Sequence, residues 1–379
     1  MANVSSSNGL EKYPKLRFKG FLEPWETVCL SDIATYQKER TEVTKTNYVS
    51  TENMLQNFLG LEPYLDESMI EGILFRKSDT LLANIRPYLR KTWFATENGA
   101  CSTDVLAIHP TNVDPKFLYN VIAQNSFIDY VMSGAKGSKM PRGDKAHIME
   151  YEIAIPNNVY EQNKIADFLQ LISDRIEKIQ QLIEHLKKYK RGVVKAIFSG
   201  KLNLSAEYPF EFWENKAICE CLKYEQPQKY IVATEKYDDS FTTPVLTANK
   251  GFILGYTDEQ QGIYDKGDVI IYDDFTMDMK YVTFNFKVKS STIKMLTPTQ
   301  GNDLYFMYSL LQSLELQPEG HQRSYISKVE PMIVQVPPYE LQLHISEFLK
   351  NIDDRVVFAE KQLALLVTQK QGLMQGLFA

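Results

Sequence analysis

Two stretches of this chain repeat one another, and each has the apolar spacing of a long helix. Residues 165–169 (IADFL) correspond to residues 345–349 (ISEFL), which places the second copy 180 positions after the first. Within both stretches apolar residues return at alternating steps of four and three, the heptad seam of a coiled coil. The residues expected on this seam are Ile165, Leu169, Ile172, Ile176, Ile179, Ile183, Leu186 and Val193 in the first stretch and Ile345, Leu349, Ile352, Val356, Leu363, Leu366 and Leu373 in the second.

The length of each stretch limits how it can pack. A helix of about 35–40 residues spans roughly 50–60 Å, which exceeds the width of a small domain. Such a helix needs a partner along its length, and the other copy carries the same seam. A lysine interrupts both seams at the same place, Lys190 and Lys370, as expected of a device that sets helix register. We therefore expect an intramolecular antiparallel coiled coil with an approximate two-fold axis.

The segments around the helices also repeat. Residues 24–26 (PWE) correspond to residues 212–214 (FWE), 188 positions apart, so the chain reads as globular unit, helix, globular unit, helix. Short runs of β-branched and aromatic residues bounded by Gly, Asn, Asp or Pro predict strands, and the expected fold is mixed α/β (α+β). The expected strands are 80–85, 93–96, 105–108 and 152–155 in the first unit, with one helix over 117–130, and 269–272, 281–286, 292–296 and 332–336 in the second, with a helix over 304–314.

Composition narrows the class of protein. The chain has 379 residues, is 44% hydrophobic and carries a net charge of −6, so it is long enough for two or three domains and is not intrinsically disordered. It contains no apolar run of the ~18–20 residues that a membrane span needs, and no apolar signal segment near its start. Four cysteines without metal-ligand spacing suit a reducing cytoplasm. We expect a cytoplasmic protein with no membrane partner.

Motifs for nucleotide, metal or methyl-donor chemistry are missing from the sequence. Neither a GxxxxGK[ST] phosphate loop nor a GxGxxG turn is present. Residues 336–339 (VPPY) are similar to a loop of amino-methyltransferases, but Val336 lacks the acceptor that would hold the target amine. The five histidines show no ligand spacing, and the acidic pairs 238–239 and 273–274 are expected to be solvated or to make polar contacts. The chain is therefore expected to have no catalytic residue and no metal.

Local basic loops are the main candidates for function. Glycines alternate with lysine and arginine over residues 134–145, and a second basic cluster spans residues 84–91. Cations and backbone N–H groups in such loops can reach phosphates and base edges. In the second unit, residues 319–328 again place a glycine before side chains suited to bases, such as arginine for guanine. The candidate DNA-binding residues are Arg86, Arg90, Lys91, Lys136, Ser138, Lys139, Arg142, Lys145, His321, Gln322, Arg323, Ser324 and Lys328.

Taken together, these features resemble the specificity (S) subunit of type I restriction–modification enzymes. The resemblance covers nearly the whole chain beyond the N-terminal tail. One departure is residues 273–276 (DDFT), which lack the Arg-Pro-Tyr run of the first unit, so Arg86 has no counterpart there. The stretches that carry the resemblance are residues 162–169, 188–192 and 197–202 with their repeat as far as Phe378, and residues 84–88, 91–95 and 137–143.

The resemblance implies a division of labour within a bacterial or archaeal complex. Two target recognition domains would each contact half of a split, asymmetric site in double-stranded DNA, and the helices would be the spacer ruler and the platform for two methylating (M) subunits. S-adenosylmethionine would bind the M subunits, and ATP and Mg the separate translocase (R) subunits, so this chain would hold no cofactor. The implied order is an N-terminal tail (1–20), target recognition domain 1 (21–158), spacer helix 1 (159–200), target recognition domain 2 (201–338) and spacer helix 2 (339–379).

Two other functions stay open from the residues alone. One is a self-contained methyltransferase or nuclease that acts at split sites, which methyl transfer by the purified chain would favour. The other is a coiled-coil adaptor without a DNA function, which duplex binding that weakens steeply with salt would exclude.

Overall fold

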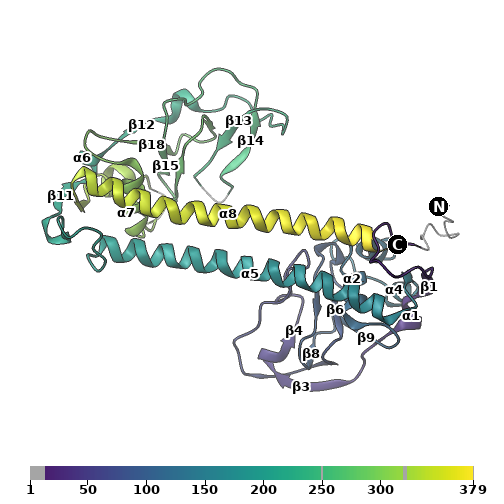
Figure 1. Cartoon of the computed structure of the whole chain (residues 1–379). Helices are drawn as coiled ribbons and strands as arrows, with labels where there is room; N and C mark the ends of the chain where they lie inside the picture. The colour runs from purple at the N-terminus through teal and green to yellow at the C-terminus, as the bar shows by residue number, and fades with distance from the viewer. Residues whose placement is uncertain (1–12, 249–250, 319–321, 379) are drawn as a thin grey trace. The chain divides into compact units, whose positions relative to one another are not determined.

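The computed structural model describes residues 13–248, 251–318 and 322–378, and these residues form two compact units (Figure 1). Unit 1 holds the described residues up to Gln180 together with those from Lys361 onward, and unit 2 holds Gln181–Glu360. Two long helices contribute to both units: α5 spans Val159–Phe198 and α8 spans Tyr339–Leu377. Proline precedes both helices, at Pro156 and at Pro337–Pro338, where a helix has not yet begun.

The two long helices run in opposite directions within unit 2. Lys187 of α5 pairs with Glu360 of α8 at 2.8 Å, and Lys190 pairs with Asp353 at 2.6 Å, so advancing along one helix means moving back along the other. In unit 1 the start of α5 and the end of α8 share one apolar core. All predicted seam residues are buried or half-buried. The predicted antiparallel packing of the two helices is confirmed.

Unit 1 combines short helices with sheets that are antiparallel except where β4 pairs with β8. One four-stranded sheet has the order β2-β9-β6-β7, a second has the order β3-β5-β8-β4, and β1 pairs with β10. The bounds are β1 Glu26–Cys29, α1 Leu30–Ile33, β2 Ala34–Tyr36, β3 Arg40–Thr44, β4 Tyr48–Val49, β5 Met69–Phe75, β6 Thr80–Ala83, β7 Thr92–Phe94, β8 Gly99–Cys101, β9 Val105–Pro110, α2 Pro115–Ile122, α3 Asn125–Ser133, α4 Lys145–Met149 and β10 Glu152–Ile155.

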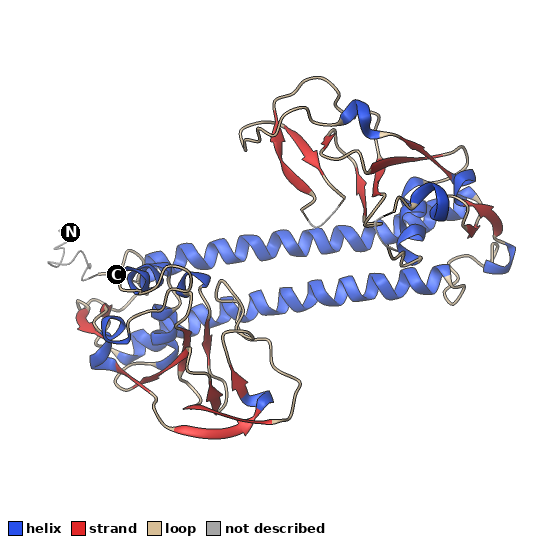
Figure 2. Cartoon of the chain, turned by 180° about the vertical axis from the view of Figure 1, so that it is seen from behind, coloured by secondary structure: helices blue, strands red, loops and turns tan. Residues whose placement is uncertain are grey.

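Unit 2 repeats the four-stranded sheet, the pairing of its first and last strands and the helix that follows the sheet (Figure 2). Its four-stranded sheet has the order β12-β18-β15-β16, a three-stranded sheet has the order β14-β13-β17, and β11 pairs with β19. The bounds are β11 Glu214–Ala217, α6 Ile218–Cys221, β12 Leu222–Glu225, β13 Thr243–Leu246, β14 Ile253–Thr257, β15 Val269–Asp273, β16 Met279–Val282, β17 Lys287–Val288, β18 Ile293–Pro298, α7 Leu304–Ser313 and β19 Ile333–Val336.

The same aromatic packing closes the core of each unit. In unit 1 the ring of Phe117 lies 6.2 Å from Trp25 and 5.2 Å from Phe378, near the end of α8. In unit 2 the ring of Phe306 lies 6.2 Å from Trp213 and 5.3 Å from Phe198, the last residue of α5. The duplication read from the sequence therefore extends to equivalent contacts in the two cores.

The predicted single helix over residues 117–130 was wrong. Two helices, α2 and α3, replace it, and Gln124 between them is extended (φ −105°, ψ 152°). An unbroken helix would turn Asn125 and Asp129 toward the core, because they share the apolar face at 3.6 residues per turn. The break instead buries Phe127 and leaves both polar residues exposed.

The predicted strand over 281–286 was also wrong in its extent. Strand β16 ends at Val282, and residues 283–285 form no strand before Phe286 bridges to Tyr264. Phe286 is fully buried in a separate core, beside Tyr264 at a ring distance of 5.0 Å. The chain leaves the first sheet so that this ring can enter the second core.

Residues 16–18 pack against both long helices in unit 1. The Leu16 backbone N–H donates to the carbonyl of Gly376 in α8 at 2.7 Å. Arg17 forms a 2.7 Å ion pair with the buried Glu161 of α5, and the Phe18 ring contacts Phe168. This segment therefore stabilises the helix ends. None of the helices described here is long and apolar enough to cross a membrane.

Candidate nucleic-acid interface

The two basic segments predicted separately in unit 1 lie against each other. Ile85 and Arg142 form a β-bridge, and the Arg86 N–H donates to the Pro141 carbonyl at 2.7 Å. The Gly143 N–H donates to the Asn84 carbonyl at 3.1 Å. A Cβ on Gly143 would lie 2.8 Å from the Asn84 side-chain oxygen, so this close approach requires glycine. These contacts join residues 84–91 and 134–145 into one basic surface, which we call the first loop surface.

The loop that follows α3 is a small hairpin. Lys136 and Arg142 donate their backbone N–H groups to each other's carbonyls at 2.9 Å, and Gly137 turns the chain at φ +97°. Residues at its tip project into solvent. The exposed candidates on the first loop surface are Arg86, Lys136, Ser138, Lys139, Arg142 and Lys145, whereas Arg90 and Lys91 are half-buried.

Carboxylates and carbonyls already engage some of these cations. Lys136 pairs with Asp144 at 2.6 Å, and this hydrogen bond raises the lysine pKa and lowers the Asp144 pKa. Lys91 donates to the Thr51 carbonyl at 2.6 Å, and burial, followed by the charge of Arg86, lowers its pKa. Among the described residues the side chains of Arg86, Lys139 and Lys145 have no ion-pair partner, so their charge remains available to an anion.

Arg142 is both paired with a carboxylate and largely exposed. Its Nη2 atom pairs with Oδ1 of Asp104 at 2.8 Å, and its side chain remains 58% exposed. Asp104 follows β8, and its carbonyl accepts a hydrogen bond from the Asn84 N–H at 2.8 Å. The carboxylate thus orients the guanidinium while leaving most of it in solvent.

Unit 2 builds an equivalent junction after strand β15. The Asp274 N–H donates to the Thr292 carbonyl, and the Ser324 N–H donates to the Asp274 carbonyl, both at 3.0 Å. Arg323 therefore precedes the anchored residue, as Arg142 precedes Gly143 in unit 1. Gln322 and Arg323 are exposed and Lys328 is half-buried. We call residues 322–328 with this junction the second loop surface; His321 lies outside the described residues.

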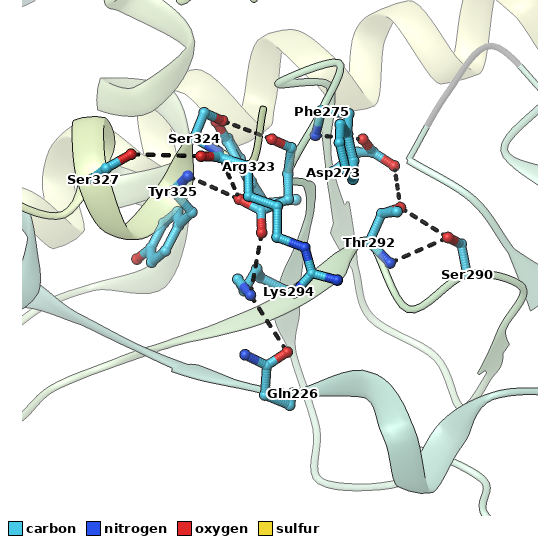
Figure 3. Close-up of polar contacts among 12 residues, drawn as sticks. Gln226, Asp273, Phe275, Ser290, Thr292, Lys294, Arg323, Ser324, Tyr325 and Ser327 are labelled. Atoms are coloured by element: carbon cyan, nitrogen blue, oxygen red, sulfur yellow. Dashed lines mark hydrogen bonds and ion pairs between the residues drawn. The ribbon is translucent and has the colours of Figure 1, made fainter. Parts of the chain in front are cut away.

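The prediction that Ser324 contacts DNA does not fit its position. Ser324 is buried, and its Oγ donates to the Asp274 carbonyl at 2.9 Å and lies 3.1 Å from the Tyr272 hydroxyl. These internal hydrogen bonds use the hydroxyl that a base would need. Ser324 instead anchors the loop, as Figure 3 shows beside Arg323.

A buried ion pair stabilises the residues that anchor the second loop surface. Lys294 and Asp274 lie 3.2 Å apart with side chains only 1% and 2% exposed, and Gln226 accepts a further hydrogen bond from Lys294 (Figure 3). Asp274 Oδ1 also accepts from the Ser324 and Tyr325 N–H groups, at the start of the short π-helix Tyr325–Val329. The acidic pair thus makes polar contacts, as predicted.

Sequence reasoning missed large apolar side chains on both loop surfaces. Tyr88 and Met140 are about half exposed in unit 1, and Ile326 is 54% exposed in unit 2. A signal was present, because each is a large apolar residue in a polar loop without helical or strand periodicity. Exposed apolar atoms beside cations can contact the thymine methyl group or the sugar.

The lysine that interrupts the first seam has a defined set of partners. Lys190 donates to Asp353 at 2.7 Å and to the Tyr305 hydroxyl at 3.2 Å. Tyr305 also donates to Asp353, so the three side chains join α5, α7 and α8. In unit 1 the equivalent Lys370 is half-buried, and burial lowers its pKa.

The long helices also carry apolar side chains outside the seam. In unit 2 a hollow of about 450 Å³ on α5 is lined by residues that include His185, Tyr189, Gly192 and Ala196. The exposed apolar residues of the long helices include Leu182, Tyr189, Tyr339, Leu343, Val357 and Phe358 in unit 2 and Leu171 and Leu365 in unit 1. No group of three or more metal-binding side chains occurs in the described part of the chain.

Residues 22–188 match the family model described as type I restriction modification DNA specificity domain. Two Escherichia coli proteins are similar in sequence. The type I restriction enzyme EcoR124I/EcoR124II specificity subunit is 47% identical over 124 residues, 31% of this chain and 31% of that protein. The EcoDI specificity subunit is 22% identical over 182 residues, 46% of this chain and 40% of that protein. The matches thus span less than half the length of either relative.

Two solved structures share the fold. The crystal structure of a type I restriction-modification system S subunit from M. genitalium covers 97% of this chain and 99% of its own, with a TM-score of 0.63 and 17% identity. A chain from a study of complex assembly and conformational transition of the type I R-M system covers 93% of this chain and 96% of its own, with a TM-score of 0.53 and 15% identity. The predicted fold class and the resemblance are confirmed.

Proposed function

We propose that this chain, whose residues 22–188 match the family model described as type I restriction modification DNA specificity domain, is the DNA-specificity subunit of a type I restriction–modification complex. In this role it reads a split, asymmetric sequence in double-stranded DNA. Each loop surface contacts one half of that sequence. The domain boundaries predicted from the sequence, with recognition domains at 21–158 and 201–338, belong to this proposal.

The observation that carries the proposal is the pair of equivalent loop surfaces. Both include the residue that follows an inner strand of a four-stranded sheet, Asn84 after β6 and Asp274 after β15. Both are anchored by the same backbone hydrogen bonds, and both expose an arginine just before the anchored residue. Their other side chains differ. A shared frame with different polar side chains is what two readers of different base sequences require, since base edges carry the sequence information.

Cations without ion-pair partners on the first loop surface suit the phosphate backbone. Phosphate contacts position a protein on the duplex, whereas contacts to base edges specify the sequence. We assign Arg86, Lys139 and Lys145 to phosphates. Arg142 in unit 1 and Arg323 with Gln322 in unit 2 are assigned to bases.

The exposed apolar side chains on α5 and α8 form the platform for methylating (M) subunits. Phe358, Leu182 and Leu343 keep 41–62% of their surface exposed on folded helices, and such side chains offer apolar area to a partner. Two M subunits, which supply the S-adenosylmethionine site, and R subunits, which supply ATP and Mg sites, complete the complex. This chain is non-catalytic, holds no cofactor and acts in the cytoplasm where DNA is accessible.

The test is selection of bound duplexes from a randomised library by the full-length chain together with its M subunits. A bipartite sequence is expected. Arg142→Ala should relax recognition at the first half-site and Arg323→Ala at the second, each by about 1–3 kcal/mol for a good base contact.

Arg76→Ala is the matched control, because Arg76 is exposed in unit 1 but pairs with Glu39 away from the first loop surface. Its selected sequence should equal that of the wild-type chain. Selection of no sequence by the wild-type chain would contradict the proposed function, as would equal loss at both half-sites from either arginine variant.

A further inference from the structure

Asp104 and Thr292 occupy equivalent places in the two units. The Asp104 carbonyl accepts from Asn84 N–H at 2.8 Å, and the Thr292 carbonyl accepts from Asp274 N–H at 3.0 Å. The Asn84 carbonyl accepts a hydrogen bond from the Gly143 N–H, and the Asp274 carbonyl accepts one from the Ser324 N–H. Gly143 and Ser324 each follow an exposed arginine. Two backbone hydrogen bonds thus connect Asp104, through Asn84, to the residue after Arg142. Two equivalent bonds connect Thr292, through Asp274, to the residue after Arg323.

The side chains at these places differ in what they offer the arginine. In unit 1 the Asp104 carboxylate pairs with Nη2 of Arg142 at 2.8 Å. In unit 2 the Thr292 hydroxyl donates to Asp273 at 2.7 Å and contacts Ser290. Figure 3 shows Thr292 turned to these partners. Within the described residues, no carboxylate pairs with the guanidinium of Arg323.

A carboxylate brace changes what an arginine can do at a DNA surface. The guanidinium has five N–H donors in a planar fork, so one donor can be held by Asp104 while others remain for a base. The brace limits rotation of the fork and offsets its charge. A restrained and partly neutralised fork is better suited to the paired acceptors O6 and N7 of guanine than to a phosphate.

We propose that Asp104 is a specificity-determining positioning residue that holds Arg142 in the orientation for guanine in the first half-site. This inference rests on the proposed function. Among the residues that the structure describes, Arg323 has no such brace, because Thr292 stands in the equivalent place. The preference for guanine at the contacted position is therefore stronger in the first half-site than in the second.

The experiment repeats the duplex selection with the full-length chain and its M subunits, using Asp104→Asn. Asparagine keeps the size and the backbone carbonyl but removes the charge that pairs with Arg142. Preference for guanine at one position of the first half-site should fall about tenfold. The second half-site and the salt dependence of binding should not change. Asp129→Asn, which removes an exposed charge on α3, is the matched control and should leave the selected sequence unchanged.

Two results separate this inference from the function on which it rests. If Asp104→Asn selects the same bipartite sequence with undiminished guanine preference, and binds all duplexes more tightly with a steeper salt dependence, then Arg142 is a phosphate contact and the brace is refuted. If the wild-type chain selects no sequence, the proposed function fails and the brace fails with it. The reciprocal Thr292→Asp should sharpen a guanine preference in the second half-site, and no change there would also count against the brace.

Discussion

At the scale of single residues, Glu259 shows how one carboxylate organises a loop of unit 2. It pairs with Lys287 at 2.9 Å, and it accepts hydrogen bonds from the N–H groups of Ala233 and Thr234. The Lys287 side chain is only 4% exposed. Burial raises the Glu259 pKa, but the hydrogen bond from Lys287 and those from the two N–H groups outweigh it and lower the pKa to about 2.

This lowered pKa predicts a pH-dependent contribution to stability. The contribution is fully present above the ordinary glutamate pKa of 4.5 and is lost as the pH falls through about 2. Glu259→Gln should lower the free energy of unfolding by about 2 kcal/mol at pH 7, because Lys287 is left without its counter-charge. Denaturant unfolding of both chains at pH 7 and pH 3 checks this. A difference that stays constant or grows toward pH 3 would contradict it.

Residue-level prediction from the sequence succeeded for two arginines and failed for the partners of the loop residues. Cations in the glycine-containing loops were expected to reach phosphates and base edges, and Arg142 and Arg323 are exposed. The burial of Ser324 was not foreseeable, because its hydroxyl is used by Asp274, 50 positions away in the chain. The role of Asp104 was missed for the same reason, since only the folded junction places it beside Arg142.

At the scale of elements, a glutamine fixes the start of each long helix. Gln162 of α5 donates to the Pro156 carbonyl and accepts from the Asp114 N–H, both at 2.8 Å. Gln342 of α8 donates to the Pro337 carbonyl at 2.9 Å and accepts from the Asp303 N–H at 2.8 Å. Each glutamine therefore joins a long helix to the N-cap of the helix that follows the central sheet.

Removal of either glutamine should cost similar stability. Gln162→Ala and Gln342→Ala each leave a half-buried N–H and a buried carbonyl without their partner, so each should lower the free energy of unfolding by about 1–3 kcal/mol. Denaturant unfolding measures both. The exposed Gln317 is the control. Among the described residues its side chain makes a single 3.5 Å contact, to the carbonyl of Glu315, so Gln317→Ala should change stability by less than about 0.5 kcal/mol. A loss confined to one of the two helices would contradict the equivalence.

Elements were predicted well where a periodic pattern continued for many residues. The heptad spacing predicted both long helices, α5 and α8, since each pattern extends over about eight helical turns. The break between α2 and α3 was missed because residues 117, 121, 122 and 128 fit one helical face. The break between α2 and α3 depends on the burial of Phe127 by tertiary packing and not on the local spacing of apolar residues.

At the scale of the whole molecule, the long helices are expected to bind partners as well as each other. Phe358 is 62% exposed on α8 in unit 2, so a charge there should not disturb the seam. Phe358→Asp should reduce copurification of M subunits at least tenfold, because it places a charge in the proposed apolar contact.

Asn203→Asp is the control for this variant. Asn203 is exposed away from the helix face, and its side-chain oxygen accepts from the Ser205 N–H, which aspartate can also do. It adds the same charge and should leave assembly intact. Copurification of both variants with M subunits at wild-type levels would refute the helical platform, provided their thermal unfolding matches that of the wild-type chain.

The duplication was the property of the whole chain that sequence alone revealed most fully. It predicted two units and two helices, and the matched cores around Phe117 and Phe306 agree with it. It did not predict the second small sheets, β3-β5-β8-β4 and β14-β13-β17, because their short strands show little alternation. Their strand pairing depends on neighbours that are distant in the chain.

The anchoring of both loop surfaces by main-chain groups has an evolutionary consequence. Since N–H and carbonyl groups hold each arginine-bearing turn in place, most side chains around it are free to vary without loss of the fold. Point mutation can then alter the preferred base while leaving the supporting scaffold intact. Under the proposed function, a new recognition sequence is therefore reached in small steps, each of which yields a folded protein.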